Sequence, residues 1–212
     1  LKWDYIIIHE SGHEWFANNI TYKDIADMWI HEGFTMYSEA LFVDYHYGKQ
    51  AGEEYVIGCR RTIKNDIPII GPYHVNQEGS SDMYNKGANI VHTIRHIMAD
   101  DEKFRQMLRG VNADFYHQTV TSADVENYIS QKAGRDLSKV FDQYLRDVRI
   151  PKLAVTVKGS KVSYRWENVI DGFDMPVKAV IDGREQMLYP TTKWQTVKGK
   201  TLVADRNFYV EN

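Results

Sequence analysis

The chain has 212 residues, of which 43% are hydrophobic and 26% charged, and its formal net charge is -3. This is the composition of an ordinary globular protein that can bury a core, and it is typical of neither a disordered nor a membranous chain. Nucleic acid is not expected as a partner, because no surplus of lysine and arginine is present to neutralise phosphates. No apolar run approaches the roughly 18 residues that a membrane span needs. The single cysteine, Cys59, allows neither an internal disulfide nor a cysteine-based metal cluster.

The first two thirds of the chain have mostly helical spacing of their apolar residues. The segment 67–81 between the third and fourth periodic runs contains Pro and Gly residues that exclude regular helix, and Asp82 after it is a candidate N-cap. We predict helices at 4–17, 27–47, 52–64, 83–99, 101–109, 122–133 and 136–147.

The period changes at Pro151 to an alternation of apolar and polar residues, with Gly and Asp between the runs. These strands are too short to bury much alone, so we expect them to pack on the helical part. The predicted fold class is therefore α+β, with a helical domain at 1–150 followed by a small antiparallel, β-sandwich-like domain at 151–212.

The sequence His9-Glu10-Ser11-Gly12-His13 has the pattern HExxH. Residues four apart lie on one face of an α-helix, so both imidazoles can point at the same metal ion. Zinc in a catalytic site takes three protein ligands and leaves the fourth position to water. Glu10 lies too far around the helix to share the ion, but it is well placed beside the water as a general base.

A third ligand has to come from another segment, and the sequence offers Glu32 in WIHEGF, separated from His13 by 18 residues. The chance of finding both HExxH and a glutamate at one fixed later position is on the order of 1 in 1000 in a random chain of this composition. We therefore predict one Zn²⁺ per chain, held by His9, His13 and Glu32.

The surrounding residues resemble the gluzincin aminopeptidases, the family that includes aminopeptidase N and the bifunctional leukotriene hydrolase. HExxH, 18 residues and then Glu is the pattern of that family. HESGHEWFANNIT and DMWIHEGFTMYSE are similar to its HELAHQWFGNLVT and DLWLNEGFASYVE, and MYNKGA is similar to its Tyr-x-Lys-Gly-Ala segment. The resemblance covers most of residues 3–155 and is weak beyond them.

This resemblance implies a mainly helical, thermolysin-like catalytic domain and the same three zinc ligands. It implies Glu10 as the base and Tyr84 as the hydrogen-bond donor that stabilises the oxyanion, which is a role physical reasoning supports for a phenol near zinc. By the same alignment Glu39, seven residues after Glu32, is a candidate to orient a ligand imidazole from outside the metal shell.

The family motif GxMEN, whose glutamate holds the free amine of the substrate, lies upstream of HExxH, and only eight residues precede His9. The chain begins with Leu1 and looks like a piece of a longer polypeptide, whose upstream domains we expect to complete the site; cellular location is not indicated. An aminopeptidase acting on peptides is the first interpretation. A zinc endopeptidase, an epoxide-type hydrolase and a catalytically silent, zinc-bound peptide-binding module stay open as alternatives.

Three other histidines have simpler interpretations. His92 and His96 form a second pair four residues apart, but the apolar residues of their helix lie on its other side, so we expect both on the solvated surface. His31 stands about 100° around its helix from Glu32, so it is expected to line the cleft or pack beneath it.

Four aromatic residues are expected to form the core between the two zinc-bearing helices: Trp15, Phe16, Trp29 and Phe34. Gly12 inside the first helix costs up to about 1 kcal/mol relative to alanine, which suggests close backbone packing or a tolerated defect.

Overall fold

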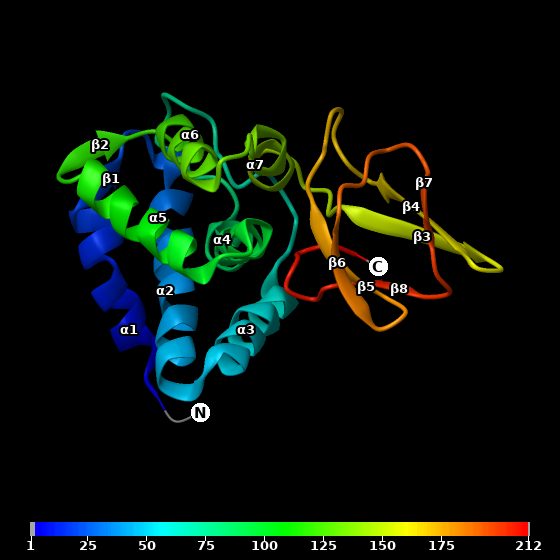
Figure 1. Cartoon of the computed structure of the whole chain (residues 1–212). Coiled ribbons are helices and arrows are strands. Elements are labelled where there is room, and N and C mark those ends of the chain that lie inside the picture. Colours follow the sequence, from blue (N-terminus) through cyan, green and yellow to red (C-terminus); the bar gives the residue numbers. More distant parts are fainter. Residues whose placement is uncertain (1–2, 212) are drawn as a thin grey trace.

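The computed structural model describes residues 3–211, and the α-helices lie at one end of the molecule and the strands after residue 151 at the other (Figure 1). Short 3₁₀ turns precede or follow several of the helices. The α-helices are α1 (Tyr5–Gly12), α2 (Trp29–Tyr47), α3 (Lys49–Gly58), α4 (Asn85–Met98), α5 (Asp101–Asp114), α6 (Ser122–Ala133) and α7 (Ser138–Leu145).

Two three-stranded antiparallel sheets follow the helices, in the orders β3-β4-β7 and β6-β5-β8. Alternate residues of β4 and β5 are buried. In the tight turn between β5 and β6, Asp182 and Gly183 both have positive φ, a backbone conformation that Asp-Gly pairs favour in two-residue hairpin turns. The strands are β3 (Lys152–Lys158), β4 (Lys161–Glu167), β5 (Val177–Ile181), β6 (Arg184–Leu188), β7 (Gln195–Lys198) and β8 (Leu202–Ala204).

The expected α+β class is confirmed, whereas the domain boundary at 150/151 stays a prediction. The sequence pattern missed a parallel pair of three-residue strands in the helical part, β1 (Ile20–Tyr22) and β2 (Gln118–Val120). Such short strands carry too little alternation to be recognised before the fold brings them together. Among the described residues, no helix is long and apolar enough to cross a membrane.

Helix α4 runs through the centre of the molecule, and every residue from Lys86 to His96 is buried. The expectation that His92 and His96 lie in solvent is therefore wrong: they are 1% and 9% exposed. The apolar side of α4 packs on other helices while its polar side meets the β part, where His92 Nε2 donates to Asn207 Oδ1 at 3.0 Å. An amphipathic pattern identifies the apolar face of a helix, but it does not show what covers the polar face.

Helix α1 is shorter than predicted, since it ends at Gly12 and is followed by a wide π-type turn at Glu14–Asn18 in which Phe16 has φ -121 and ψ 65. Because of this break, Trp15 does not face the core as expected but is 55% exposed. The other three aromatic residues predicted for that core are buried: Phe16, Trp29 and Phe34.

Asp82 does not cap α4. Its carboxylate instead accepts the backbone N–H groups of Lys64 at 2.9 Å and Asn65 at 2.6 Å, and Ser80 caps the 3₁₀ turn Ser81–Met83 that leads into α4. Asp82 therefore holds the start of the irregular segment that precedes it. The two ends of this segment lie next to each other in the fold, although they are 17 to 18 residues apart in the sequence.

Candidate metal centre

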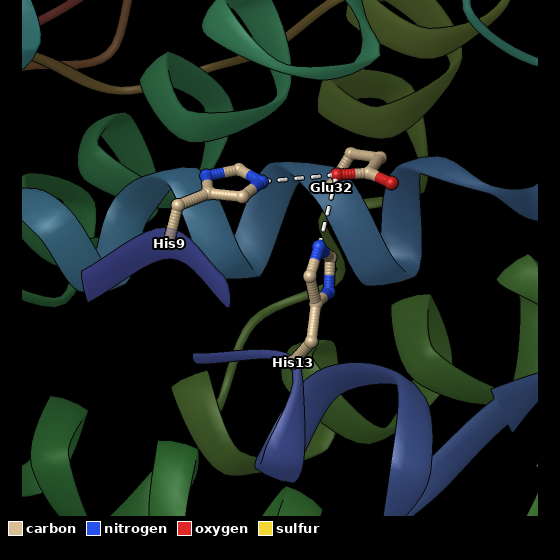
Figure 2. Close-up of side chains that lie close together, drawn as sticks. All are labelled: His9, His13 and Glu32. Carbon is tan, nitrogen blue, oxygen red and sulfur yellow. Dashed lines mark hydrogen bonds and ion pairs between the residues drawn. The ribbon is translucent and has the colours of Figure 1, made fainter. Parts of the chain in front are cut away.

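The side chains of His9, His13 and Glu32 converge from two helices onto one point (Figure 2). Nε2 of His9 lies 3.3 Å and Nε2 of His13 lies 3.5 Å from Oε2 of Glu32. One ligand atom from each residue lies within 4.8 Å of the other two. The fold therefore brings together the three residues that the sequence singled out as zinc ligands.

Close packing of α1 against α2 produces this convergence. A Cβ built on Gly12 would lie 3.0 Å from Cγ2 of Thr35, so glycine at this position lets the two helices approach closely. His9 is on the last turn of α1, His13 follows its end, and Glu32 is in the first turn of α2. Of the two expectations for Gly12, close packing is supported, although the atoms next to Gly12 are side-chain atoms of α2 rather than backbone atoms.

Hydrogen bonds on the far side of each imidazole orient the rings. Nδ1 of His9 lies 2.8 Å from Oε1 of Glu39, and Nδ1 of His13 lies 3.1 Å from the carbonyl oxygen of Phe16. Both partners are acceptors, so Nδ1 of each ring donates to its partner and Nε2 of each ring is directed towards Glu32, where it could bind a metal.

Two nitrogen lone pairs and a carboxylate that face one another repel unless a cation lies between them. Without a metal a proton takes this position: hydrogen bonds to Glu32 and Glu39 raise the pKa of His9 to about 9. Two neutral imidazoles and one carboxylate are a donor set that zinc commonly takes in catalytic sites. The residues present therefore fit a zinc ion.

All six predicted site residues line one cavity of about 550 Å³ that opens to solvent. Glu10 is exposed on its wall, one residue from His9. The six site residues are His9, Glu10, His13, Glu32, Glu39 and Tyr84. The rest of the cavity wall is formed by Tyr5, Ile6, Met36 and Asn85.

Tyr84 stands at the start of α4, where its ring stacks on that of His9 with 6.0 Å between centroids. Burial, followed by the negative charge of Glu32, raises the pKa of the Tyr84 phenol above its usual value. The hydroxyl thus stays protonated at neutral pH and is available as a hydrogen-bond donor inside the cavity.

Two glycines set the distance between Glu32 and Tyr84. Helices α2 and α4 cross at Gly33 and Gly87, where a Cβ on Gly87 would lie 2.9 Å from the Cα of Gly33. Gly33 directly follows Glu32, and Gly87 lies about one helical turn after Tyr84. Any larger side chain at this crossing would separate the two functional groups.

Sequence reasoning did not find the groups that hold His13. These are the carbonyl oxygen of Phe16 and the hydroxyl of Thr35, which lies 3.2 Å from His13 Nδ1. The contact to the Phe16 carbonyl could not be predicted from residue types, because every residue has a backbone carbonyl. Thr35 could have been found, because it lies one turn after the predicted ligand Glu32 on the same face of the helix.

His31 lies beside the site but does not join it. Its Nε2 accepts the backbone N–H of Tyr22 at 3.2 Å, and burial lowers its pKa to about 4. His31 is therefore neutral at physiological pH and ties α2 to β1. Of the two expectations, it does not line the cavity, so packing beneath the cleft is the one that stays.

The mainly helical fold and the HExxH pair next to a distant carboxylate define the metallopeptidase class. The family model described as the peptidase family M1 domain matches residues 2–144, and the chain belongs to this family. The resemblance to the gluzincin aminopeptidases is thereby confirmed.

Curated relatives agree with this assignment. The chain is 24% identical over 208 residues to a leucyl aminopeptidase of Saccharolobus solfataricus, covering 93% of this chain and 25% of the relative. It is 24% identical over 165 residues to aminopeptidase N of Lactococcus lactis, covering 72% of this chain and 19% of the relative. The chain thus spans about a quarter of the length of the curated relatives it matches.

Solved structures share the fold. Aminopeptidase A of Legionella pneumophila, in complex with aspartic acid, aligns with a TM-score of 0.63 at 18% identity and covers 98% of this chain and 25% of that chain. A mutant M1 zinc metallopeptidase of Deinococcus radiodurans bound to a Tyr-Ser-Ala substrate aligns with a TM-score of 0.58 at 20% identity, covering 68% of this chain and 33% of that chain.

Proposed function

We propose that this chain carries the catalytic centre of a zinc-dependent aminopeptidase, which removes N-terminal residues from peptides. The observation that carries the proposal is the convergence of His9, His13 and Glu32 in a cavity whose wall also contains Glu10 and Tyr84. Membership of peptidase family M1 and the aminopeptidase names of the relatives support the same activity.

Nε2 of His9, Nε2 of His13 and the Glu32 carboxylate would hold one zinc ion per chain. Bound zinc supplies a Lewis acid that polarises the scissile carbonyl and lowers the pKa of water towards about 7. Glu10 accepts the proton of the attacking water and passes it to the leaving amine. Tyr84 donates a hydrogen bond to the oxygen on which negative charge develops, and the loss of one such donor costs about 100 to 1000-fold in rate.

Other parts of the polypeptide are proposed to complete the site. Tyr5, Ile6 and Ile7 on α1 are 55%, 47% and 61% exposed, and the first two also line the cavity. Large apolar side chains grouped beside a functional cavity favour coverage by another protein segment. Because the matched relatives are about four times as long, we assign this role to upstream domains of the same polypeptide.

The test is the Glu10→Gln variant of the intact polypeptide, which keeps the shape of the side chain but removes the base. It should bind zinc as the unmodified protein does and lose turnover of an aminoacyl reporter amide by at least about 100-fold. The matched control is Glu14→Gln, because Glu14 is an exposed glutamate one turn further on.

Normal turnover in zinc-loaded Glu10→Gln would refute the role of Glu10. A comparison of free and N-blocked peptides tests the substrate class, since only an aminopeptidase needs the free amine. Equal cleavage of both would favour an endopeptidase.

A further inference from the structure

Helix α3 contributes one side chain that reaches towards the metal centre from behind. Tyr55 on α3 donates a short hydrogen bond from its hydroxyl to Oε2 of Glu39. The other carboxylate oxygen of Glu39, Oε1, accepts from Nδ1 of His9 at 2.8 Å. A continuous chain of hydrogen bonds therefore runs from Tyr55 through Glu39 to His9.

Glu39 depends on these two donors. Its side chain is 1% exposed, so solvent does not compensate its charge. Among the residues that the structure describes, Tyr55 is the one donor to Oε2, while His9 Nδ1 serves Oε1. Leaving a buried acceptor without its partner is energetically costly. A Glu39 side chain deprived of the Tyr55 hydroxyl would lose one of the two contacts that fix its orientation, and it would then hold His9 less firmly.

The backbone between α2 and α3 is built to bring Tyr55 to this place. Gly48 reverses the chain direction with φ +95. One turn into α3, a Cβ on Gly52 would lie 2.8 Å from the carbonyl oxygen of Ala40, so glycine lets α3 lie directly on α2. Tyr55 follows one turn later, on the same side of α3.

The ring of Tyr55 is also held in position. The ring of Trp3 packs on it with 5.3 Å between centroids. Because Tyr55 is anchored in α3 and its ring packs on the indole of Trp3, its hydroxyl is held in one direction. Forming the hydrogen bond to Glu39 therefore costs little additional side-chain entropy. The hydroxyl is therefore already oriented when Glu39 accepts its hydrogen bond.

We propose that Tyr55 is a positioning residue of the metal centre, which acts through Glu39 to keep the His9 imidazole oriented with its Nε2 lone pair towards the metal. The inference rests on the proposed zinc site. Tyr55 itself touches neither metal nor substrate. Its effect is expected in zinc affinity, because removing a partner that orients a ligand from outside the metal shell typically costs about 10 to 100-fold in metal affinity.

The experiment measures the zinc dissociation constant of the intact polypeptide by competition with a chromophoric chelator. Tyr55→Phe removes only the hydroxyl and is expected to weaken zinc binding about 10-fold, the low end of the range for partners outside the metal shell. The matched control is Tyr128→Phe, which removes a tyrosine hydroxyl bonded to the carboxylate of Asp114 at 2.7 Å and lies outside the metal site. The control is expected to bind zinc as the unmodified protein does.

A double-mutant cycle with Glu39→Gln separates positioning from a general loss of stability. If Tyr55 acts through Glu39, Tyr55→Phe should change zinc affinity less than about 2-fold in the Glu39→Gln background, because coupled residues are not additive. Unchanged zinc affinity in Tyr55→Phe would overturn the proposal. So would a loss that persists in full in the Glu39→Gln background.

Failure of the proposed function gives a different result. If the unmodified polypeptide binds no zinc at His9, His13 and Glu32, the zinc site itself is refuted before the variants are compared. If it binds zinc and Tyr55→Phe binds equally well, the zinc site stands and the role of Tyr55 is refuted.

Discussion

Substitution of Gly87 by alanine tests whether the close crossing of α2 and α4 positions the site. The new Cβ would lie 2.9 Å from the Cα of Gly33, which is backbone and has no rotamer by which to move aside. Carbon atoms normally pack at about 3.5 to 4.0 Å. The two helices would have to separate by roughly 0.6 to 1.1 Å, and Glu32 and Tyr84 would move apart with them.

Two opposing effects set the expected change in stability. Overpacking in a well-packed core costs about 1 to 3 kcal/mol. Alanine in a helix interior stabilises the folded state by up to about 1 kcal/mol relative to glycine. The free energy of unfolding of Gly87→Ala should therefore fall by about 1 kcal/mol, and a misplacement of about 1 Å at the site should lower turnover by about 100-fold.

Urea unfolding followed by circular dichroism measures the first effect, and hydrolysis of a reporter amide measures the second. Gly58→Ala is the control, because Gly58 is helical with φ -59 and ψ -33 and a Cβ there meets nothing within 4 Å. It should be neutral or stabilised by up to about 1 kcal/mol. If Gly87→Ala is as stable and as active as Gly58→Ala, the crossing does not set the site geometry.

Three further outcomes are expected. Burial lowers the pKa of His96 to about 4, below the unfolded value of 6.5, so the unfolded state binds more protons between these values and stability should fall as the pH drops from 6.5 to 4. His96→Gln should reduce this loss of stability by about 1 to 3 kcal/mol in urea unfolding at acid pH, and an unchanged loss would contradict the role of His96. Tyr144→Phe should lower the free energy of unfolding by about 1 to 2 kcal/mol, because the buried Tyr144 hydroxyl donates to the carbonyl oxygen of Tyr209 at 2.6 Å. An unchanged free energy of unfolding would show that this link between α7 and the C-terminal segment is dispensable. Zinc at 100 times its dissociation constant should stabilise the chain by about 2.7 kcal/mol, and equal stabilisation of Glu32→Gln would contradict the ligand assignment.

The local part of the site could be predicted because its geometry follows from helix periodicity. His9 and His13 lie four residues apart, so any helix through them makes a chelating pair, and Glu10 follows at a defined angle. Glu32 followed from the need for a third ligand at one later position, and the resemblance to one family added Tyr84 and Glu39. The change from helical to alternating periodicity at Pro151 likewise predicted the α+β class, since both periods are properties of short stretches of chain.

Tertiary structure alone decided which groups support that site and which faces are buried. The turn that breaks α1 after Gly12 presents the Phe16 carbonyl to His13 and exposes Trp15. The polar side of α4 is covered by the β part, so His92 is buried although its helix looks amphipathic. Tyr55 reaches Glu39 only because α3 folds back onto α2. The residue types of a segment indicate its secondary structure and its chemistry. Which distant residue a side chain contacts depends on how the segments pack together, and a local sequence pattern does not contain that information.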